Sequence, residues 1–307
     1  MAVLIAAPDR DLSGLLARIG ELAPELDIRT QQQLGDLNSI DFAVVWKHPA
    51  GLLGQLHGLK AISSLGAGAE HLLADPELPP DLPVGRLAGE RLAADMAAWL
   101  VARVIGHWRR FDQLQVQQNE RRWQPLTPQS PPAVGLLGLG AMGNKAFQAF
   151  RSLDIPVAGY SRTGRGPDGM DIHSGPDGLK ALVSRSDYLI CLLPLTQHTR
   201  GILNAELFKH MKTGSVLINV GRGEHLVEPD LIDALKTGRP GEAILDVFST
   251  EPLPADHPFW NHPQIHISPH CASITHPREA AELIVASYRR VQAGKPPLGL
   301  VDRNRGY

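Results

Sequence analysis

A glycine-rich turn near the middle of the chain constrains the fold more than any other feature. Residues 138–143 read Gly-Leu-Gly-Ala-Met-Gly, directly after the apolar run 134–137 and at the start of a helical pattern over 142–153. A G-x-G-x-x-G turn between strand and helix brings the backbone close to a pyrophosphate and offers it free helix N–H groups. We therefore predict a dinucleotide site that uses Gly138, Gly140, Ala141, Met142 and Gly143; a turn that serves only packing is the alternative.

Apolar runs alternate with helical patterns along the rest of the chain. Strands are expected at residues 2–7, 42–46, 61–65, 134–137, 157–160, 188–193, 215–219, 243–246 and 265–268, and helices at 12–22, 142–153, 230–236 and 277–293. This alternation is typical of parallel sheets covered by helices. We predict an α/β protein of two Rossmann-like, doubly wound parallel-sheet domains. The dinucleotide-binding domain (94–275) is inserted into a substrate, or catalytic, domain (1–93 and 276–307).

Residues 90–123 contain no proline and carry apolar residues at helical spacing. The four prolines of residues 124–133 cannot continue a helix. We predict one long helix that bridges the two domains, with Trp99, Trp108 and Trp123 in core or subunit contacts. The Gly-Pro-Asp-Gly segments around Asp168 and Asp177, with Asp171 and His173 between them, read instead as solvated loops.

Charge and cysteine content exclude several classes of protein. A formal net charge of −2 gives no reason to expect nucleic acid or an anionic membrane as a partner. The apolar start breaks at Pro8, too early for a membrane span or a signal peptide. Cys191 and Cys271 are too few for a disulfide framework. We expect a cytoplasmic protein.

The segment after the strand at 157–160 bears on the choice of cofactor. NAD sites usually place an acid there for the ribose hydroxyls, but this chain has Ser161, Arg162, Thr163 and Arg165. Basic and hydroxyl side chains suit a 2′-phosphate. The loop favours NADP, and a solvated basic loop is the alternative.

Three late segments carry residues suited to carbonyl chemistry. Arg222 lies between two glycines after the strand at 215–219, Glu251 precedes a proline, and His270 follows the strand at 265–268. The carboxyl ends of parallel strands meet at a ligand-binding edge. A Cys271–His270 nucleophile is disfavoured, because neighbours on an extended chain point to opposite faces. A metal site of His270 with the histidines at 262 and 266 is disfavoured too, because no other ligand recurs nearby.

Several segments together resemble the D-2-hydroxyacid dehydrogenase family over nearly the whole chain. They are GLGAMG, PLTQHTRGIL, INVGRGEHL, LDVFSTEPLP and SPHCA, in the family's order and spacing. The pair Trp46-Lys47, the stretch HWRRFDQLQ, the loop SRTGR and the terminal VDRNRGY resemble the branch that reduces glyoxylate and hydroxypyruvate. The resemblance implies reduction of a small 2-oxo acid by hydride from NADPH, preferred over NADH, with no metal. It also implies a homodimer that pairs through the cofactor domain.

The resemblance also implies a role for each site residue. Arg222 clamps the substrate carboxylate and carbonyl oxygen, His270 gives a proton, and Glu251 orients His270. Trp46 forms a wall of the substrate pocket that limits substrate size. The backbone N–H groups of a glycine-rich turn also bind the substrate, since such turns bind anions; they belong to Leu65, Gly66, Ala67 and Gly68. Cofactor contacts beyond the glycine turn fall on Ser161, Arg162, Thr163, Leu193, Pro194, Thr199, Val220, Gly221, Arg222, Asp246 and His270.

Two other functions are consistent with the same fold. One is an NAD-dependent D-2-hydroxyacid dehydrogenase of another specificity, disfavoured by the missing acid at 161–165. The other is a corepressor-like protein that senses dinucleotide and regulates partners. The presence of Arg222, Glu251 and His270 disfavours it, because a sensor has no use for a proton relay.

Overall fold

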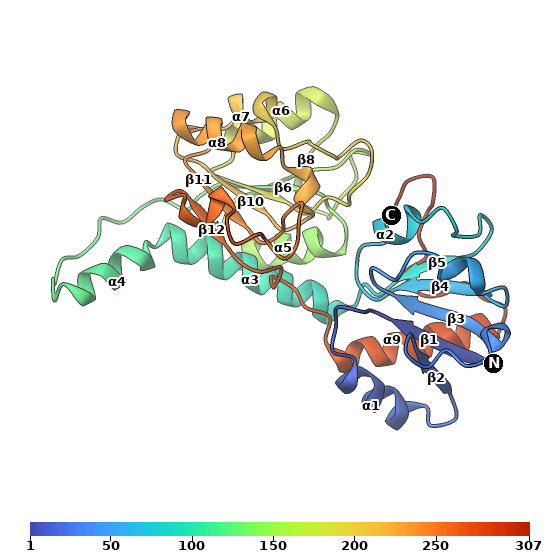
Figure 1. Ribbon diagram of the computed structural model, residues 1–307. Coiled ribbons are helices and arrows are strands. Elements are labelled where there is room, and N and C mark those ends of the chain that lie inside the picture. The colour runs from blue at the N-terminus through green and yellow to red at the C-terminus, as the bar shows by residue number, and fades with distance from the viewer. The chain divides into compact units, whose positions relative to one another are not determined.

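A computed structural model describes residues 1–307, and the chain divides into two compact units (Figure 1). Unit 1 comprises Met1–Leu92 and Thr275–Tyr307, and unit 2 comprises Ala93–Ile274. Each unit contains one sheet in which every strand pair is parallel. The predicted fold class, two α/β domains with parallel sheets, is confirmed.

Unit 1 is built on a five-stranded sheet of order β2-β1-β3-β4-β5. The strands are β1 (Ala2–Ala6), β2 (Asp27–Thr30), β3 (Ile40–Val45), β4 (Ala61–Ser64) and β5 (Val84–Arg86). Every residue of β1, β3 and β4 is buried, as expected of parallel strands covered on both faces. Helices α1 (Ser13–Leu22) and α9 (Pro277–Gln292) pack side by side on one face, and α2 (Glu70–Leu73) contributes to the core of the other.

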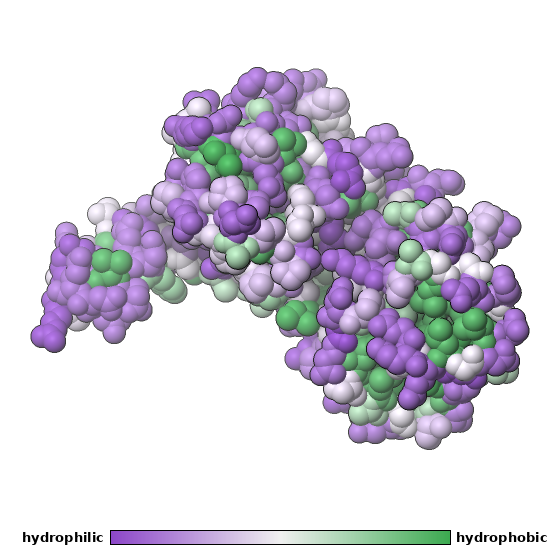
Figure 2. All heavy atoms as spheres, viewed as in Figure 1, coloured by the Kyte–Doolittle hydropathy of each residue, from purple (hydrophilic) through white to green (hydrophobic).

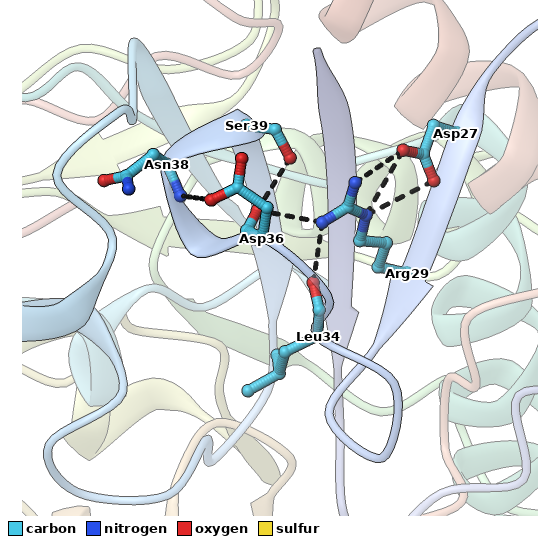
Figure 3. A network of polar contacts seen from close by, with 6 residues as sticks. All are labelled: Asp27, Arg29, Leu34, Asp36, Asn38 and Ser39. Carbon is cyan, nitrogen blue, oxygen red and sulfur yellow. Dashed lines mark hydrogen bonds and ion pairs between the residues drawn. The ribbon is translucent and has the colours of Figure 1, made fainter.

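The edge strand β2 was not predicted, because its sequence Asp-Ile-Arg-Thr has no apolar run. One arginine side chain holds the loop that follows it (Figure 3). The Arg29 guanidinium donates to the carbonyl oxygens of Leu34 and Asp36, both at 2.8 Å, and to the carboxylate of Asp27 at 2.8 Å. The hydrogen bond from Arg29 lowers the pKa of Asp27. Arg29 therefore closes the connection from this polar edge strand back to β3.

Unit 2 is built on a seven-stranded sheet of order β12-β11-β10-β9-β6-β7-β8. The strands are β6 (Val134–Leu137), β7 (Val157–Tyr160), β8 (Asp171–His173), β9 (Tyr188–Cys191), β10 (Val216–Asn219), β11 (Glu242–Leu245) and β12 (Ile265–Ile267). Helices α3 (Glu90–Trp108) and α5 (Ala141–Arg151) cover one face, and α6 (Gly175–Arg185), α7 (Ala205–Lys209) and α8 (Glu228–Thr237) cover the other. The strand order reverses at β6, where doubly wound sheets bind ligands.

The predicted solvated loops around residues 168–178 were wrong in part. Asp171 and His173 belong to the edge strand β8, which pairs with β7. The second Gly-Pro-Asp-Gly segment, which contains Asp177, forms the first turn of α6. Proline suits that position, because its missing N–H has no partner in a first helical turn anyway. The sequence Gly-Pro-Asp-Gly is therefore compatible both with a solvated turn and with the first turn of a helix.

The predicted single helix over residues 90–123 was also wrong. Helix α3 ends at Trp108, and a separate helix α4 (Phe111–Asn119) follows. Between them Arg110 has a left-handed backbone (φ +54°) and donates from its guanidinium to the carbonyl oxygen of Thr127 at 2.5 Å. Trp99 and Trp108 pack against the core of unit 2, whereas Trp123 is 98% exposed. No helix of the chain is both long and apolar enough to cross a membrane.

A carboxylate shared by two histidines ties α3 to the amino-terminal edge of the unit 2 sheet. Glu242 of β11 pairs with His107 of α3 (Oε1–Nε2, 3.2 Å) and with His266 of β12 (Oε2–Nε2, 2.8 Å). The hydroxyl of Tyr188 lies 2.6 Å from Nδ1 of His107. The hydrogen bonds from His107 and His266 lower the pKa of Glu242 to about 2.

We expect Glu242→Gln to lower the free energy of unfolding at neutral pH and to make it less dependent on pH between about 4.5 and 2. A depressed carboxylate pKa stabilises the folded state above the ordinary value of 4.5 and loses that contribution as pH falls toward about 2. Because Glu242 is partly exposed, the effect is on the order of 1 kcal/mol. Urea unfolding at neutral pH and at pH values across this window measures it. The control Glu206→Gln, in an exposed pair with Lys209, should leave the unfolding midpoint unchanged. Equal pH dependence in Glu242→Gln and the wild type would contradict the assignment.

Candidate functional site

The predicted residues of unit 2 follow the carboxyl ends of six parallel strands. Residues 138–143 follow β6, 161–163 follow β7, 193–199 follow β9, 220–222 follow β10, Asp246 and Glu251 follow β11, and His270 follows β12. Parallel strands end at the same edge of a sheet. The structure therefore brings all of these residues to one edge of the seven-stranded sheet.

The glycine turn has the geometry that a dinucleotide needs. Gly138 has a φ of +100°, and a Cβ there would lie 2.8 Å from the carbonyl oxygen of Leu192. A Cβ on Gly143 would lie 2.1 Å from the carbonyl oxygen of Gly138, so strand β6 and helix α5 touch through backbone. At Gly140, which caps α5, a Cβ would meet nothing within 4 Å. The turn thus leaves open space at the N–H groups of α5, where a pyrophosphate fits.

The basic loop after β7 is a closed turn with exposed side chains. The N–H of Ser161 donates to the carbonyl oxygen of His173 (3.1 Å), and its hydroxyl donates to that of Arg165 (2.6 Å). Arg162 and Thr163, at the tip, are exposed. Since no acid lies within residues 161–165, the loop presents positive charge and a hydroxyl at the end of β7.

His270 and Glu251 form a pair. Nδ1 of His270 lies 2.8 Å from Oε2 of Glu251, whose Oε1 accepts the N–H of Phe248 at 3.1 Å. The backbone of His270 has a φ of +49°, a strained conformation for a residue with a Cβ. Because Glu251 engages Nδ1, Nε2 is the ring nitrogen left for a substrate oxygen.

Asp246 holds the loop that carries His270. Its carboxylate accepts the hydroxyl of Ser268 (2.6 Å) and the N–H groups of Cys271 (3.0 Å) and Ala272 (2.9 Å), and the residue is 1% exposed. The carbonyl oxygen of Asp246 accepts the N–H of His270 at 2.8 Å. The family resemblance implies that Asp246 is one of the cofactor contacts. In the structure its oxygens brace residues 268–272, which explains how the strained backbone of His270 is maintained.

Arg222 is fixed through its own backbone. Its N–H donates to Nδ1 of His225 (2.9 Å), and its carbonyl oxygen accepts from Nδ2 of Asn219 (2.9 Å). A Cβ on Gly223 would lie 1.9 Å from the carbonyl carbon of Phe248, so only glycine allows this approach to the segment after β11. Sequence reasoning missed His225, because Arg-x-x-His is not the Ser/Thr-x-x-Glu/Gln pattern of a capping box, and its contact with the Arg222 N–H appears only in the folded chain.

The loop after β9 is stabilised by its own hydroxyls. Oγ1 of Thr199 donates to the carbonyl oxygen of Pro194 (2.7 Å) and accepts the N–H of Thr196 (2.8 Å). Leu193 and Pro194 lie in the loop that begins at Leu192, after the end of β9. The N–H of Val220 donates to the carbonyl oxygen of Cys191 (3.2 Å). Thr199 therefore shapes this loop, and the loop lies beside the end of β10.

In unit 1, Trp46 and the turn 65–68 follow the neighbouring strands β3 and β4. The N–H of Leu65 donates to the carbonyl oxygen of Val45 (2.9 Å), and that of Gly66 to Oγ of Ser64 (3.3 Å). The N–H groups of Ala67 and Gly68 make no hydrogen bond within the protein. Of the four predicted anion-binding groups, these two are the ones that the fold leaves for a ligand.

Trp46 packs tightly against this turn. A Cβ on Gly66 would lie 2.6 Å from the indole ring. Cζ of the Arg10 guanidinium lies 4.3 Å from the centroid of the Trp46 ring. The centroid of the His71 ring lies 4.8 Å from that of Trp46. Trp46 is 9% exposed, so its position is set by packing on several sides.

The alternative chemistries at His270 have no support from the geometry. Burial raises the pKa of the Cys271 thiol, and the His270 ring engages Glu251 instead. The other two histidines of this stretch have different partners, since Nδ1 of His262 accepts the N–H of Gln264 and His266 pairs with Glu242. No group of three or more histidine, cysteine or acidic side chains in the chain is arranged to hold a metal.

Comparison with known proteins agrees with this geometry. The sequence profile of the D-isomer specific 2-hydroxyacid dehydrogenase NAD binding domain matches residues 101–272. The chain is 38% identical to glyoxylate/hydroxypyruvate reductase A of Yersinia enterocolitica, over 96% of this chain and 95% of that protein. It is 37% identical to the protein of the same name from Serratia proteamaculans, over 100% of both chains.

Solved structures give the same result for the whole chain. A D-isomer specific 2-hydroxyacid dehydrogenase from Xanthobacter autotrophicus, in complex with NADPH and MES, superposes with a TM-score of 0.93 at 36% identity, covering 100% of this chain and 99% of that one. An NADPH-dependent glyoxylate/hydroxypyruvate reductase from Sinorhizobium meliloti, in complex with NADP and sulfate, superposes with a TM-score of 0.92 at 30% identity, covering 100% of both. The chain therefore belongs to the D-isomer specific 2-hydroxyacid dehydrogenase family, a family of NAD(P)-dependent oxidoreductases.

Proposed function

We propose that this protein reduces a small 2-oxo acid, glyoxylate or hydroxypyruvate, to the 2-hydroxy acid with NADPH. The observation that carries the proposal is the His270–Glu251 pair, at 2.8 Å, on the same sheet edge as Arg222 and the glycine turn. This edge combines a proton donor, a carboxylate-binding cation and a dinucleotide cradle. The names of the Yersinia and Serratia relatives support the choice of substrates.

Each group has a defined task in the proposed reaction. When bound, the nicotinamide supplies the hydride. Arg222 binds the substrate carboxylate and polarises the carbonyl with its planar guanidinium, a geometry matched to two oxygens. His270 donates a proton from Nε2 to the carbonyl oxygen, while Glu251 holds Nδ1 and thereby orients the ring. A chiral product has the D configuration.

Unit 1 contributes binding groups in this proposal. The N–H groups of Ala67 and Gly68 serve as carboxylate donors, as expected of a glycine-rich turn. Trp46 acts as a wall that favours small substrates, and its packing against Gly66 makes that wall rigid. A larger 2-oxo acid would have to displace an indole ring that is held by several neighbours.

Arg162 and Thr163 are proposed to bind the 2′-phosphate of NADPH. They lie exposed at the tip of a closed turn after β7, with no acid beside them. The Xanthobacter and Sinorhizobium structures contain NADPH and NADP, which supports the same preference.

We expect Arg162→Ala to raise the KM for NADPH by about 10- to 100-fold, because a charge-assisted hydrogen bond is lost. The KM for NADH should change little, since NADH has no 2′-phosphate. Steady-state kinetics with both cofactors measures the effect, with the exposed Arg185→Ala as a control of equal charge change. Parallel changes in both cofactor KM values would contradict the role of Arg162.

A homodimer through the cofactor-binding unit is also part of the proposal. Helix α4 and the segment after it expose Phe111, Leu114, Val116 and Trp123, and apolar spheres are visible on α4 in Figure 2. Exposed large apolar side chains of this kind mark protein interfaces. Light scattering should give the mass of two chains of 33.3 kDa, and Leu114→Glu combined with Val116→Glu should give one. A wild-type mass of one chain would contradict the dimer.

The reducing cytoplasm is the compartment that we propose for this protein. Both cysteines are free thiols, which is the usual state of cysteine in that compartment.

The proposed function is tested by following NADPH absorbance with glyoxylate, hydroxypyruvate and pyruvate, in parallel with NADH. We expect rapid oxidation of NADPH with glyoxylate and hydroxypyruvate, and slow oxidation with NADH. NADPH binding without turnover of any 2-oxo acid would favour a dinucleotide sensor instead. Equal use of NADH would contradict the NADP assignment and leave the reaction class standing.

A further inference from the structure

A buried imidazole next to Arg222 has hydrogen-bond partners on both of its nitrogens. His225 is 0% exposed and ends the short 3-10 turn Gly223–His225. Its Nδ1 accepts the backbone N–H of Arg222 at 2.9 Å, and its Nε2 lies 3.3 Å from the carbonyl oxygen of Pro194. Because Nδ1 must accept, the proton resides on Nε2 and is donated to Pro194.

The surroundings hold the ring in this neutral form. Burial lowers the pKa of His225, although Glu224 and the two backbone contacts partly oppose that effect. The ring also lies against Gly221, where a Cβ would come within 2.8 Å of Nδ1. The histidine therefore has one tautomer, one orientation and two fixed partners.

The two partners belong to different parts of the site. Arg222 follows β10 and carries the proposed substrate clamp. Pro194 follows β9, and its carbonyl oxygen also accepts the hydroxyl of Thr199 at 2.7 Å, so it belongs to the loop proposed to contact the cofactor. A hydrophobic residue could fill the same volume, but it would leave the Arg222 N–H and the Pro194 carbonyl without this partner.

We infer that His225 is a positioning residue, which sets the Arg222 backbone through Nδ1 and the 194–199 loop through Nε2. The inference deepens the proposed function and rests on it. It predicts that the two nitrogens act separately: the loss of the Nδ1 contact weakens substrate binding, and the loss of the Nε2 contact weakens cofactor binding.

Two amide variants separate the nitrogens. In His225→Asn, the side-chain oxygen occupies the place of Nδ1 and keeps the bond to Arg222, but nothing reaches Pro194. In His225→Gln, the longer side-chain amide donates to the carbonyl oxygen of Pro194, but no acceptor remains at the position of Nδ1 for the Arg222 N–H. We expect His225→Gln to raise the KM for the 2-oxo acid about tenfold with little change in that for NADPH, and His225→Asn to do the reverse. His225→Leu should raise both.

Measurements of Tm and of the NADPH dissociation constant, by nucleotide fluorescence, accompany the kinetics. Equal effects of Asn and Gln on both KM values, or Tm losses with unchanged KM values, would show a merely structural histidine and overturn the inference. If the wild type reduces no 2-oxo acid, the proposed function fails. The dissociation constants then still decide the positioning role, because only His225→Asn and His225→Leu should weaken NADPH binding.

Discussion

Replacing Arg222 by alanine is expected to lower kcat/KM for glyoxylate by about 10²- to 10³-fold, as when a preorganised donor to developing negative charge is removed. The guanidinium is the proposed partner of both the substrate carboxylate and the carbonyl oxygen. Its guanidinium also donates to the carbonyl oxygen of the neighbouring Gly221 at 2.7 Å. The fold should survive the change, because two other contacts of this residue use its backbone. The N–H to His225 and the carbonyl to Asn219 remain in alanine.

Arg222→Lys is the matched variant. It keeps the positive charge and loses the planar fork, so we expect it to recover only part of the lost rate. Thermal unfolding of all three proteins checks that the fold is unchanged. If the alanine variant retains most of kcat/KM at an unchanged Tm, Arg222 does not bind the substrate in the way proposed.

Replacing His270 by glutamine is expected to lower kcat by about 10²- to 10⁴-fold, the usual contribution of a positioned proton donor. The KM for the 2-oxo acid should change much less, because the proposed proton transfer belongs to the transition state. Glu251→Gln should have a smaller effect, since its amide can still contact Nδ1 while the orienting charge is lost.

His262→Gln is a suitable control for His270→Gln. It lies near the same strand, and its Nδ1 accepts only the N–H of Gln264, so activity should stay at the wild-type level. Equal rate losses in the two variants would point to a disturbed fold around β12. A His270→Gln variant with near-normal kcat would show that another group protonates the carbonyl.

The parts of the fold that were predicted from sequence are those whose signal is local. Strands β1, β3 and β4 are buried apolar runs, and parallel strands buried on both faces produce such runs. The glycine turn after β6 was recognised because its backbone geometry admits only glycine at Gly138 and Gly143. The parallel pairing of the strands also follows from the alternation of strand and helix patterns, whereas their order in each sheet was not predicted.

The features that were missed depend on tertiary contacts. The break between α3 and α4 is a left-handed residue, Arg110, which has no composition signal of its own. Strand β8 is short and partly exposed, and it is held by β7 rather than by an apolar run. The bracing of the His270 loop by Asp246 joins residues more than 20 positions apart, so only the folded chain reveals it.

The central claim is hydride transfer from NADPH to the carbonyl carbon of a 2-oxo acid. The most direct measurement uses NADPH that carries deuterium at both C4 positions, with hydroxypyruvate as substrate, and analyses the product by mass spectrometry and chiral chromatography. We predict glycerate of D configuration with one deuterium at C2. Two results would contradict the account: oxidation of NADPH that yields glycerate without deuterium at its C2, or glycerate of L configuration.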